Sequence, residues 1–150
     1  MQQPYPPNAE LLAVAWLKSL DGIPTNGVAT ALPGDPTTWA IDGFVQVTLV
    51  GGTPAVHTPL RNPTAQVDCW ANNPNSLKPP WGKAHALLET VVAACYDDGT
   101  QQRVFVMPTG FGNARLLTVW PVIEPRRVPG DESGFARVTV DLSMVWTVAS

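Results

Sequence analysis

Residues 44–71 read FVQVTLVGGTPAVHTPLRNPTAQVDCWA and contain the pattern that decides the fold. Near the start of this stretch Val45, Val47 and Leu49 occupy alternate positions and so share one face of a strand, and near its end Val67, Cys69 and Ala71 do the same. Alternation with a period of two, in segments rich in β-branched and aromatic residues, is typical of half-buried strands. The stretch therefore predicts two strands that frame one long loop.

The loop from Gly51 to Thr64 opens with two glycines and contains three prolines. Proline has no backbone N–H to give to a neighbouring strand, so we expect the loop to extend neither flanking strand. Loops of this length without structure of their own are uncommon in compact domains and are usually functional or mobile. We expect this loop to project and to form a contact surface. Its candidate interaction residues are Gly51, Gly52, His57 and Arg61.

A second alternating pattern closes the chain, since every other residue from Ala136 to Val148 is apolar. The pattern predicts a strand over Phe135–Val148 with one core face and one hydrated face. Such a strand is longer than the usual five or six residues, so we expect part of it to project past the sheet or to pair with another chain.

The region before this strand favours further strands over residues 28–32, 103–107 and 115–123, with a bulge or an edge position at Pro121. A turn is predicted from Pro125 to Gly134. It contains the basic pair Arg126 and Arg127, which is more typical of ion pairing than of nucleic-acid binding and which we count as candidate interaction residues.

Two helices complete the pattern. Asn8 is a good N-cap for a helix over Ala9–Leu20, after an extended N-terminal arm of residues 1–7. A second helix is predicted after Pro80, with an apolar stripe that ends at Cys95. Burial is achieved most simply when both helices lie on one face of a mostly antiparallel mixed sheet, so the sequence predicts an α+β fold in one domain, residues 1–150.

Composition limits the kind of partner. Only 14% of the residues are charged, against about 25% in a typical globular chain, and the net charge is −3. A surface so poor in charge suits a protein that covers part of itself with other subunits. No Lys/Arg run marks a nucleic-acid site. No apolar stretch reaches the ~20 residues of a membrane span, and no signal peptide is recognisable, so we expect a soluble protein made in a cytoplasm.

Residues whose side chains could act in catalysis or metal binding are few and scattered along the sequence. His57 and His85 lack metal-ligand spacing, and Cys69 and Cys95 fall on apolar faces as buried free thiols. Asp68 and Asp141 could form an acid/base pair, but hydrated strand faces explain them better. The sequence predicts no catalytic residue, no metal site and no cofactor.

Three segments, in order, resemble one protein family. They are residues 5–17 (YPPNAELLAVAWL), 44–52 (FVQVTLVGG) and 67–71 (VDCWA), the last before the second helix. In order and spacing they are similar to the tail terminator proteins of long-tailed, siphovirus-type bacteriophages, most closely those of phages of actinobacteria. The resemblance covers most of the chain, except residues 125–134, which match no part of the family's pattern.

This resemblance implies a non-enzymatic virion protein at the tail-neck junction, assembled in the host cytoplasm. Members of the tail terminator family form a hexameric ring that caps the tail tube and stops polymerisation of the major tail tube protein. The ring also offers the surface for head-tail joining through a connector or stopper protein. Another neck or head-tail completion protein remains an alternative. A different class, a small enzyme or ligand-binding domain that uses Asp68, His57 and Asp141, also remains open.

Duplex DNA should bind weakly or not at all, because a chain of net charge −3 releases few counterions on contact with phosphates. We expect no mobility shift of a 30-base-pair duplex with micromolar protein at physiological salt. Tight binding that falls steeply as salt rises would contradict the prediction.

Overall fold

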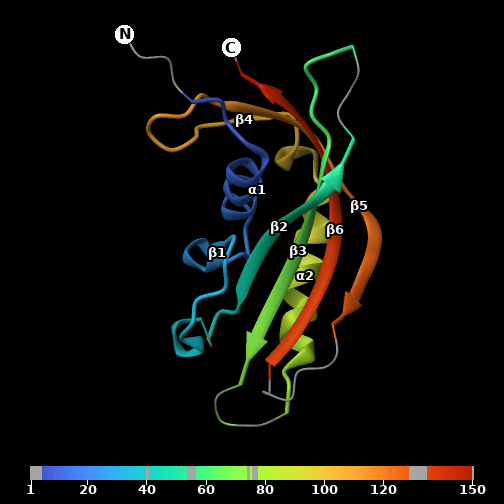
Figure 1. Cartoon of the computed structure of the whole chain (residues 1–150). Helices are drawn as coiled ribbons and strands as arrows, with labels where there is room; N and C mark the ends of the chain where they lie inside the picture. The colour runs from blue at the N-terminus through green and yellow to red at the C-terminus, as the bar shows by residue number, and fades with distance from the viewer. Residues whose placement is uncertain are drawn as a thin grey trace.

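The computed structural model describes residues 5–39, 41–53, 57–73, 75, 78–128 and 135–149. These residues form a mixed six-stranded sheet with two α-helices (Figure 1). The strands are β1 (Val28–Ala29), β2 (Phe44–Gly52), β3 (Pro63–Asn72), β4 (Arg103–Phe105), β5 (Ala114–Arg127) and β6 (Phe135–Val148). The helices are α1 (Ala9–Lys18) and α2 (Trp81–Cys95), and the 3-10 turns are η1 (Thr25–Gly27), η2 (Pro36–Thr38) and η3 (Asp98–Thr100).

The strand order is β1-β2-β3-β6-β5-β4, and every pair is antiparallel except β1 with β2. Strand β6 therefore lies near the middle, between β3 and β5. The predicted α+β class, with two helices and a mostly antiparallel mixed sheet, is confirmed.

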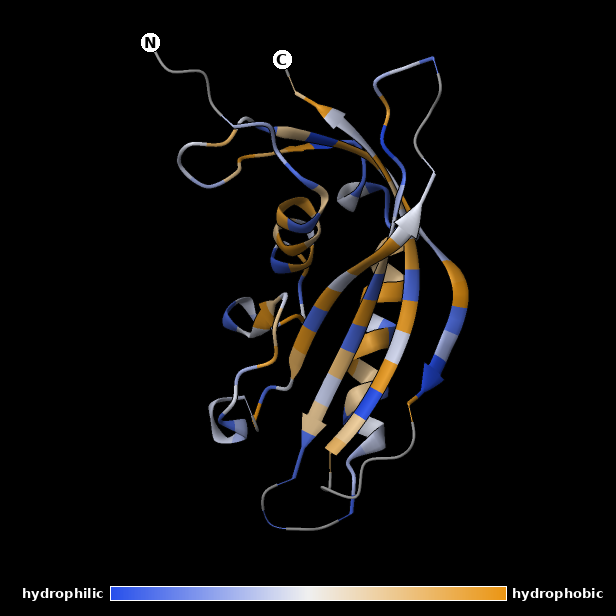
Figure 2. Ribbon diagram, viewed as in Figure 1, coloured by the Kyte–Doolittle hydropathy of each residue, from blue (hydrophilic) through white to orange (hydrophobic). Residues whose placement is uncertain are grey.

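The alternating apolar residues of the central strands point to one face of the sheet, where both helices lie. Val47 of β2, Val67 of β3 and Val140 of β6 are in register and fully buried. On this face α1 packs mainly against β1 and β2, whereas α2 packs against β3, β6 and β5. The buried side chains of both helices and of the strands join in one apolar cluster. Figure 2 shows hydrophobic and hydrophilic residues following one another along the strands and helices that contribute to it. The face with the helices is therefore the core face, and the opposite face is called the far face below.

Local signals fix both helices close to their expected bounds. The Asn8 side chain accepts a hydrogen bond from the Leu11 backbone N–H at 2.9 Å, as an N-cap does. Gly22, with a φ of 88°, turns the chain after α1. The predicted apolar stripe of α2 is buried at five positions, which are Ala84, Leu87, Leu88, Val91 and Cys95.

The expectation that the loop would extend neither neighbouring strand is wrong. Gly51 pairs with Thr64 and Gly52 with Pro63, so β2 and β3 continue beyond the predicted positions. At Gly52 φ is 120°, and an added Cβ would lie 2.3 Å from the Asn62 carbonyl oxygen. The glycines therefore permit a close, bulged end of the ladder where we expected them to break it. Residues 54–56 of the loop lie outside the described part.

Three expectations about the last two strands need correction. The segment Pro125–Arg127 continues β5 and is not a turn, while residues 129–134 lie outside the described part. Strand β6 has the predicted bounds, but it does not project, because β3 or β5 pairs with it along its length. The segments expected as strands at 28–32 and 103–107 are shorter, at Val28–Ala29 and Arg103–Phe105. The bulge expected at Pro121 is confirmed by a register shift between Pro121 and Ile123.

The described part of the predicted N-terminal arm lies along the 110–112 loop of its own chain. The Tyr5 N–H donates to the Gly110 carbonyl at 2.8 Å, and the Gly112 N–H donates to the Tyr5 carbonyl at 2.8 Å. The Tyr5 and Phe111 rings lie 5.8 Å apart. Two backbone hydrogen bonds and a ring contact therefore hold Tyr5 against the 110–112 loop.

Val140→Asp should abolish folding, because it places an unpaired charge at a side chain with no exposed surface. Such burial costs several kcal/mol, a large part of the stability of a typical domain. The variant should be insoluble or lack a cooperative thermal transition. Val148→Asp, the same change at a half-exposed position of the same strand, should leave the melting temperature nearly unchanged. A soluble Val140→Asp protein with an unchanged melting temperature would show that this face is not core.

Candidate assembly surfaces

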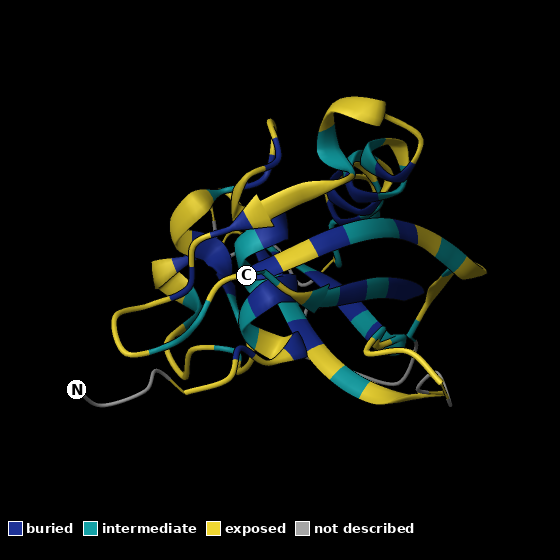
Figure 3. Cartoon of the chain, turned by 90° about the horizontal axis from the view of Figure 1, so that it is seen from above, coloured by how far each residue is buried: buried dark blue, intermediate teal, exposed yellow. Residues whose placement is uncertain are grey.

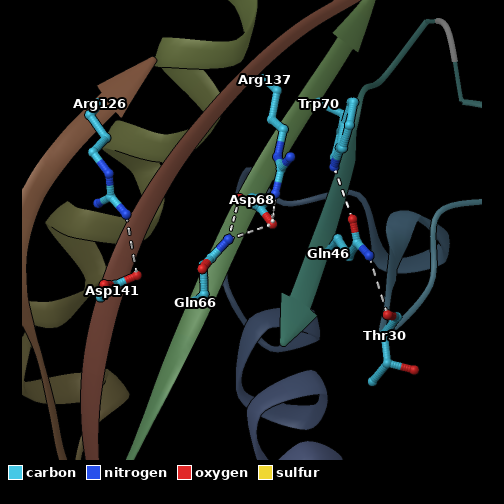
Figure 4. A network of polar contacts seen from close by, with 8 residues as sticks. All are labelled: Thr30, Gln46, Gln66, Asp68, Trp70, Arg126, Arg137 and Asp141. Carbon is cyan, nitrogen blue, oxygen red and sulfur yellow. Dashed lines mark hydrogen bonds and ion pairs between the residues drawn. The ribbon is translucent and has the colours of Figure 1, made fainter. Parts of the chain in front are cut away.

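The far face of the sheet has a row of polar side chains that the helices do not cover. Asp68, Thr139, Asp141 and Ser143 are nevertheless buried, with exposed fractions of 9% or less. Figure 4 shows the longer side chains of Arg137 and Gln66 directed at Asp68 and that of Arg126 directed at Asp141. The expected hydrated strand face is therefore wrong for these four residues.

The strongest polar contact of the far face joins Asp68 of β3 to Arg137 of β6. The guanidinium Nη2 lies 3.1 Å from the Asp68 carboxylate, which also accepts from the Gln66 amide at 3.3 Å. The side chain of Asp68 is only 2% exposed, whereas that of Arg137 is 32% exposed. The guanidinium also stacks 5.1 Å from the Trp70 ring centroid. Arg137 thus shields a buried charge from one side and meets solvent on the other.

A weaker ion pair lies further along β6. Arg126 of β5 is 3.9 Å from Asp141, and its side chain is 46% exposed. The Thr139 hydroxyl, between the two pairs on β6, is buried with no hydrogen-bond partner. The basic pair at 126–127 does contribute an ion pair, at the limit of contact distance. Arg127 instead lies over the Trp81 ring of α2, with 4.7 Å between guanidinium carbon and ring centroid.

Asp68 and Asp141 are diagonal neighbours across β3 and β6 on the far face, but His57 does not join them in one site. Each carboxylate faces an arginine, and His57 is an exposed residue of the loop between β2 and β3. No hydrogen bond or ion pair links His57 to either carboxylate within the described ranges. The arrangement offers no acid/base pair of the kind considered from the sequence.

The structure brings three of the predicted interaction residues together. Gly51, Gly52 and Arg61 line one small hollow at the end of β2 and β3. Arg61 exchanges two backbone hydrogen bonds with Trp146 of β6, of 2.8 and 2.9 Å, and its guanidinium lies 5.6 Å from the Trp146 ring. Arg61 is therefore fixed at its backbone although its side chain is exposed.

Arg126 and Arg127 lie at the other end of the sheet. Along β6, Arg61 is opposite Trp146, whereas Arg127 is opposite Val138, eight residues earlier. Figure 1 shows the loop between β2 and β3 and the end of β5 at opposite ends of the molecule. The six predicted residues therefore belong to two separate surfaces.

The sequence did not reveal an exposed apolar patch on β5. Trp120, Val122 and Ile123 are 39–49% exposed, and charged Glu124 and Arg126 follow them. We call these three apolar residues the β5 patch. The register shifts between Leu116 and Thr118 and between Pro121 and Ile123 turn side chains outward that strict alternation would place in the core. A single sequence shows a bulge at proline but not which residues it exposes.

The outer edge of β5 beside this patch is closed to strand pairing. Strand β4 pairs with β5 only at residues 114–116. At Val119 the side chain of Gln101 takes the place of a neighbouring strand as hydrogen-bond partner. Its Oε1 accepts from the Val119 N–H at 2.6 Å, and its Nε2 donates to the Val119 carbonyl at 3.5 Å. Pro121 then lacks an N–H altogether. Caps, prolines and bulges of this kind protect exposed edges from adding another strand.

An apolar groove lies on the side of the molecule opposite the β5 patch. It has a volume of about 400 Å³ and runs between α1, β1 and the 110–112 loop. Leu11, Val14, Val28 and Phe111 give it an apolar floor, and Glu10 and Lys18 of α1 stand at its rim. We call it the α1 groove.

The two cysteines are free and buried, as predicted. Burial raises the pKa of both thiols, that of Cys95 to about 12, so neither forms a reactive thiolate near neutral pH. Within the described ranges, no group of three or more His, Cys, Asp or Glu residues is placed to hold a metal ion. The helices of this part of the chain are too short or too polar to cross a membrane.

Comparison with solved structures finds a likeness in fold. No family model matches the sequence, and no curated protein matches it. A chain from a solved structure titled "Virion of native gene transfer agent (GTA) particle" has a similar fold, with a TM-score of 0.53. The match covers 95% of this chain and 87% of that chain at 14% sequence identity. At this identity the likeness shows the fold alone.

Arg137→Met should destabilise the protein by about 3 kcal/mol, because it leaves the buried Asp68 carboxylate without its partner. Arg126→Met is the matched control, because the distance from Arg126 to Asp141 is longer and the Arg126 side chain is nearly half exposed. It should cost at most about 1 kcal/mol. Urea unfolding of both variants measures the difference. Equal losses in the free energy of unfolding would show that the Asp68–Arg137 ion pair stabilises the protein no more than the Arg126–Asp141 pair does.

Proposed function

We propose that this protein is a structural component of a phage-like virion, and more specifically a tail terminator that forms a hexameric ring on the end of the tail tube. The observation that carries the proposal is the fold likeness to a chain of a gene transfer agent virion, which extends over 95% of the chain. The resemblance of residues 5–17, 44–52 and 67–71 to tail terminators points to the same class independently.

The surface chemistry supports a role in assembly. The described carboxylates of the far face are held by arginines, and both thiols are buried with raised pKa values, so these groups are poorly suited to catalysis. The low charge content leaves neutral and apolar surface that other subunits can cover. The β5 patch and the α1 groove are two such surfaces. The proposal therefore includes no enzymatic activity.

The disposition of the predicted interaction residues suits a ring with two different rims. Gly51, Gly52, His57 and Arg61 lie at one end of the sheet, and Arg126 and Arg127 at the other. In the proposed assembly one rim contacts the major tail tube protein and the other contacts the connector or stopper protein. The protein would then reside at the tail-neck junction of the virion, without specific DNA binding or membrane contact, as one domain over residues 1–150.

Another neck or head-tail completion protein is the second candidate, because it would share the size, the fold and the ring. The two candidates differ in their partner. A terminator limits tail-tube length, whereas a completion protein acts on the connector. Electron microscopy of particles made with and without the gene separates them, since only loss of a terminator gives tails of irregular length.

Replacing Ala55–Leu60 with a short Gly-Ser linker should leave the fold intact, because a change of loop length costs little entropy. The only side-chain hydrogen bond lost from the described part of this segment is that of Thr147 to the Pro59 carbonyl, at 3.3 Å. The backbone pairing of Arg61 with Trp146 is retained. We expect an unchanged melting temperature together with tails of irregular length or tails that do not join heads.

Two results would contradict this prediction. A variant that unfolds would place the loop in the core. A variant that folds and still yields infectious particles of normal tail length would show that the loop makes no essential contact.

A further inference from the structure

We propose that copies of this chain associate head to tail, with the β5 patch of one copy seated in the α1 groove of the next. This inference rests on the proposed ring and names the contact that would build it. The patch consists of Trp120, Val122 and Ile123. The groove floor consists of Leu11, Val14, Val28 and Phe111.

The two surfaces lie on opposite sides of the molecule. In Figure 1, α1 and β1 lie on the left and the C-terminal part of β5 lies on the right, with β2, β3 and β6 between them. Seen from above in Figure 3, exposed residues lie mostly toward the periphery and buried residues mostly toward the middle of the molecule. A contact between two different surfaces on opposite sides is heterologous, and it leaves one patch and one groove unused until a ring closes.

Charge complementarity identifies the occupant as a second copy. The groove carries Glu10 and Lys18 at its rim, eight residues apart on α1 and hence about 12 Å apart. The patch is followed by Glu124 and Arg126, two residues apart on β5 and hence about 7 Å apart. Long Lys and Arg side chains span the difference. Seating the patch so that Glu124 meets Lys18 brings Arg126 toward Glu10, and both pairs are then of opposite sign.

The closed edge of β5 determines the type of contact. Gln101 occupies the backbone groups of Val119, and Pro121 has no N–H. Both features hinder a neighbour from adding a strand to β5 at residues 119–121. The exposed side chains of the patch remain available. The contact is therefore made by apolar side chains entering a groove, with a rim of ion pairs.

A charge swap tests the rim of this contact. Glu124→Lys and Lys18→Glu each place like charges opposite one another, and each should weaken self-association at least five-fold in sedimentation equilibrium at low salt. The double variant restores opposite charges at every contact and should associate within about two-fold of the native chain. Glu89→Lys, at an exposed position on α2, is the control with the same charge change and should have no effect. A double variant no better than either single variant overturns the pairing.

Cross-linking tests the floor of this contact. Ile123→Cys and Val14→Cys are made in separate chains, and the native thiols stay silent because both are buried. Under mild oxidation the mixture should give a disulfide-linked dimer, whereas neither variant alone should. A dimer from Ile123→Cys alone would show that two β5 patches meet each other, and no dimer in the mixture would also overturn the inference.

The outcomes separate this contact from the proposed function. If a ring forms but the charge swap is not rescued and no disulfide-linked dimer appears, the proposed contact is contradicted and the proposed function is not. A confirmed contact in a protein whose loss leaves tails of normal length and still joined to heads contradicts the terminator alone. A native chain that stays monomeric at all concentrations contradicts both.

Discussion

Strand β6 packs side chains on both faces of the sheet and pairs with a strand at each of its edges, and the rest of the fold depends on these contacts. Its apolar positions, such as Val140 and Leu142, fill the space beneath α2, while β3 and β5 take up its backbone groups on either side. A shift by one residue would exchange the two faces and move apolar side chains away from the helices. Its register therefore determines which residues of β3 and β5 reach the core, and through them where both helices can pack.

The same register explains why charged residues are buried on a face without helices. Asp68, Thr139 and Asp141 occupy alternate positions on the two central strands, and their neighbours Arg137, Gln66 and Arg126 fold over them. A buried carboxylate is tolerated because a guanidinium offsets its lost hydration. The arginines therefore serve the stability of the sheet first, and only their exposed portions are available to a partner.

The sequence predicted what depends on local pattern and failed where distant segments decide. Asn8, the stripe of α2, the bounds of β6 and the bulge at Pro121 all follow from neighbours within a few residues, and the structure confirms them. The burial of Asp68 depends on Arg137, sixty-nine residues away, and periodicity contains no sign of that contact. Extension of β2 through Gly51 and Gly52 needed a bulge in β2, at Val50, to keep its pairing with β3. The β5 patch and the α1 groove likewise follow from curvature and packing, so no single stretch of sequence predicts them.

The amide of Gln101 that occupies the backbone of Val119 affects how accurately copies can assemble. A newly added β-strand forms many cooperative hydrogen bonds, and a misplaced copy held in that way would leave slowly. In the proposed contact, copies would meet through side chains, whose contacts break more readily. An assembly of the proposed kind would then correct its errors by dissociation, because a wrongly seated subunit is lost before the ring closes around it.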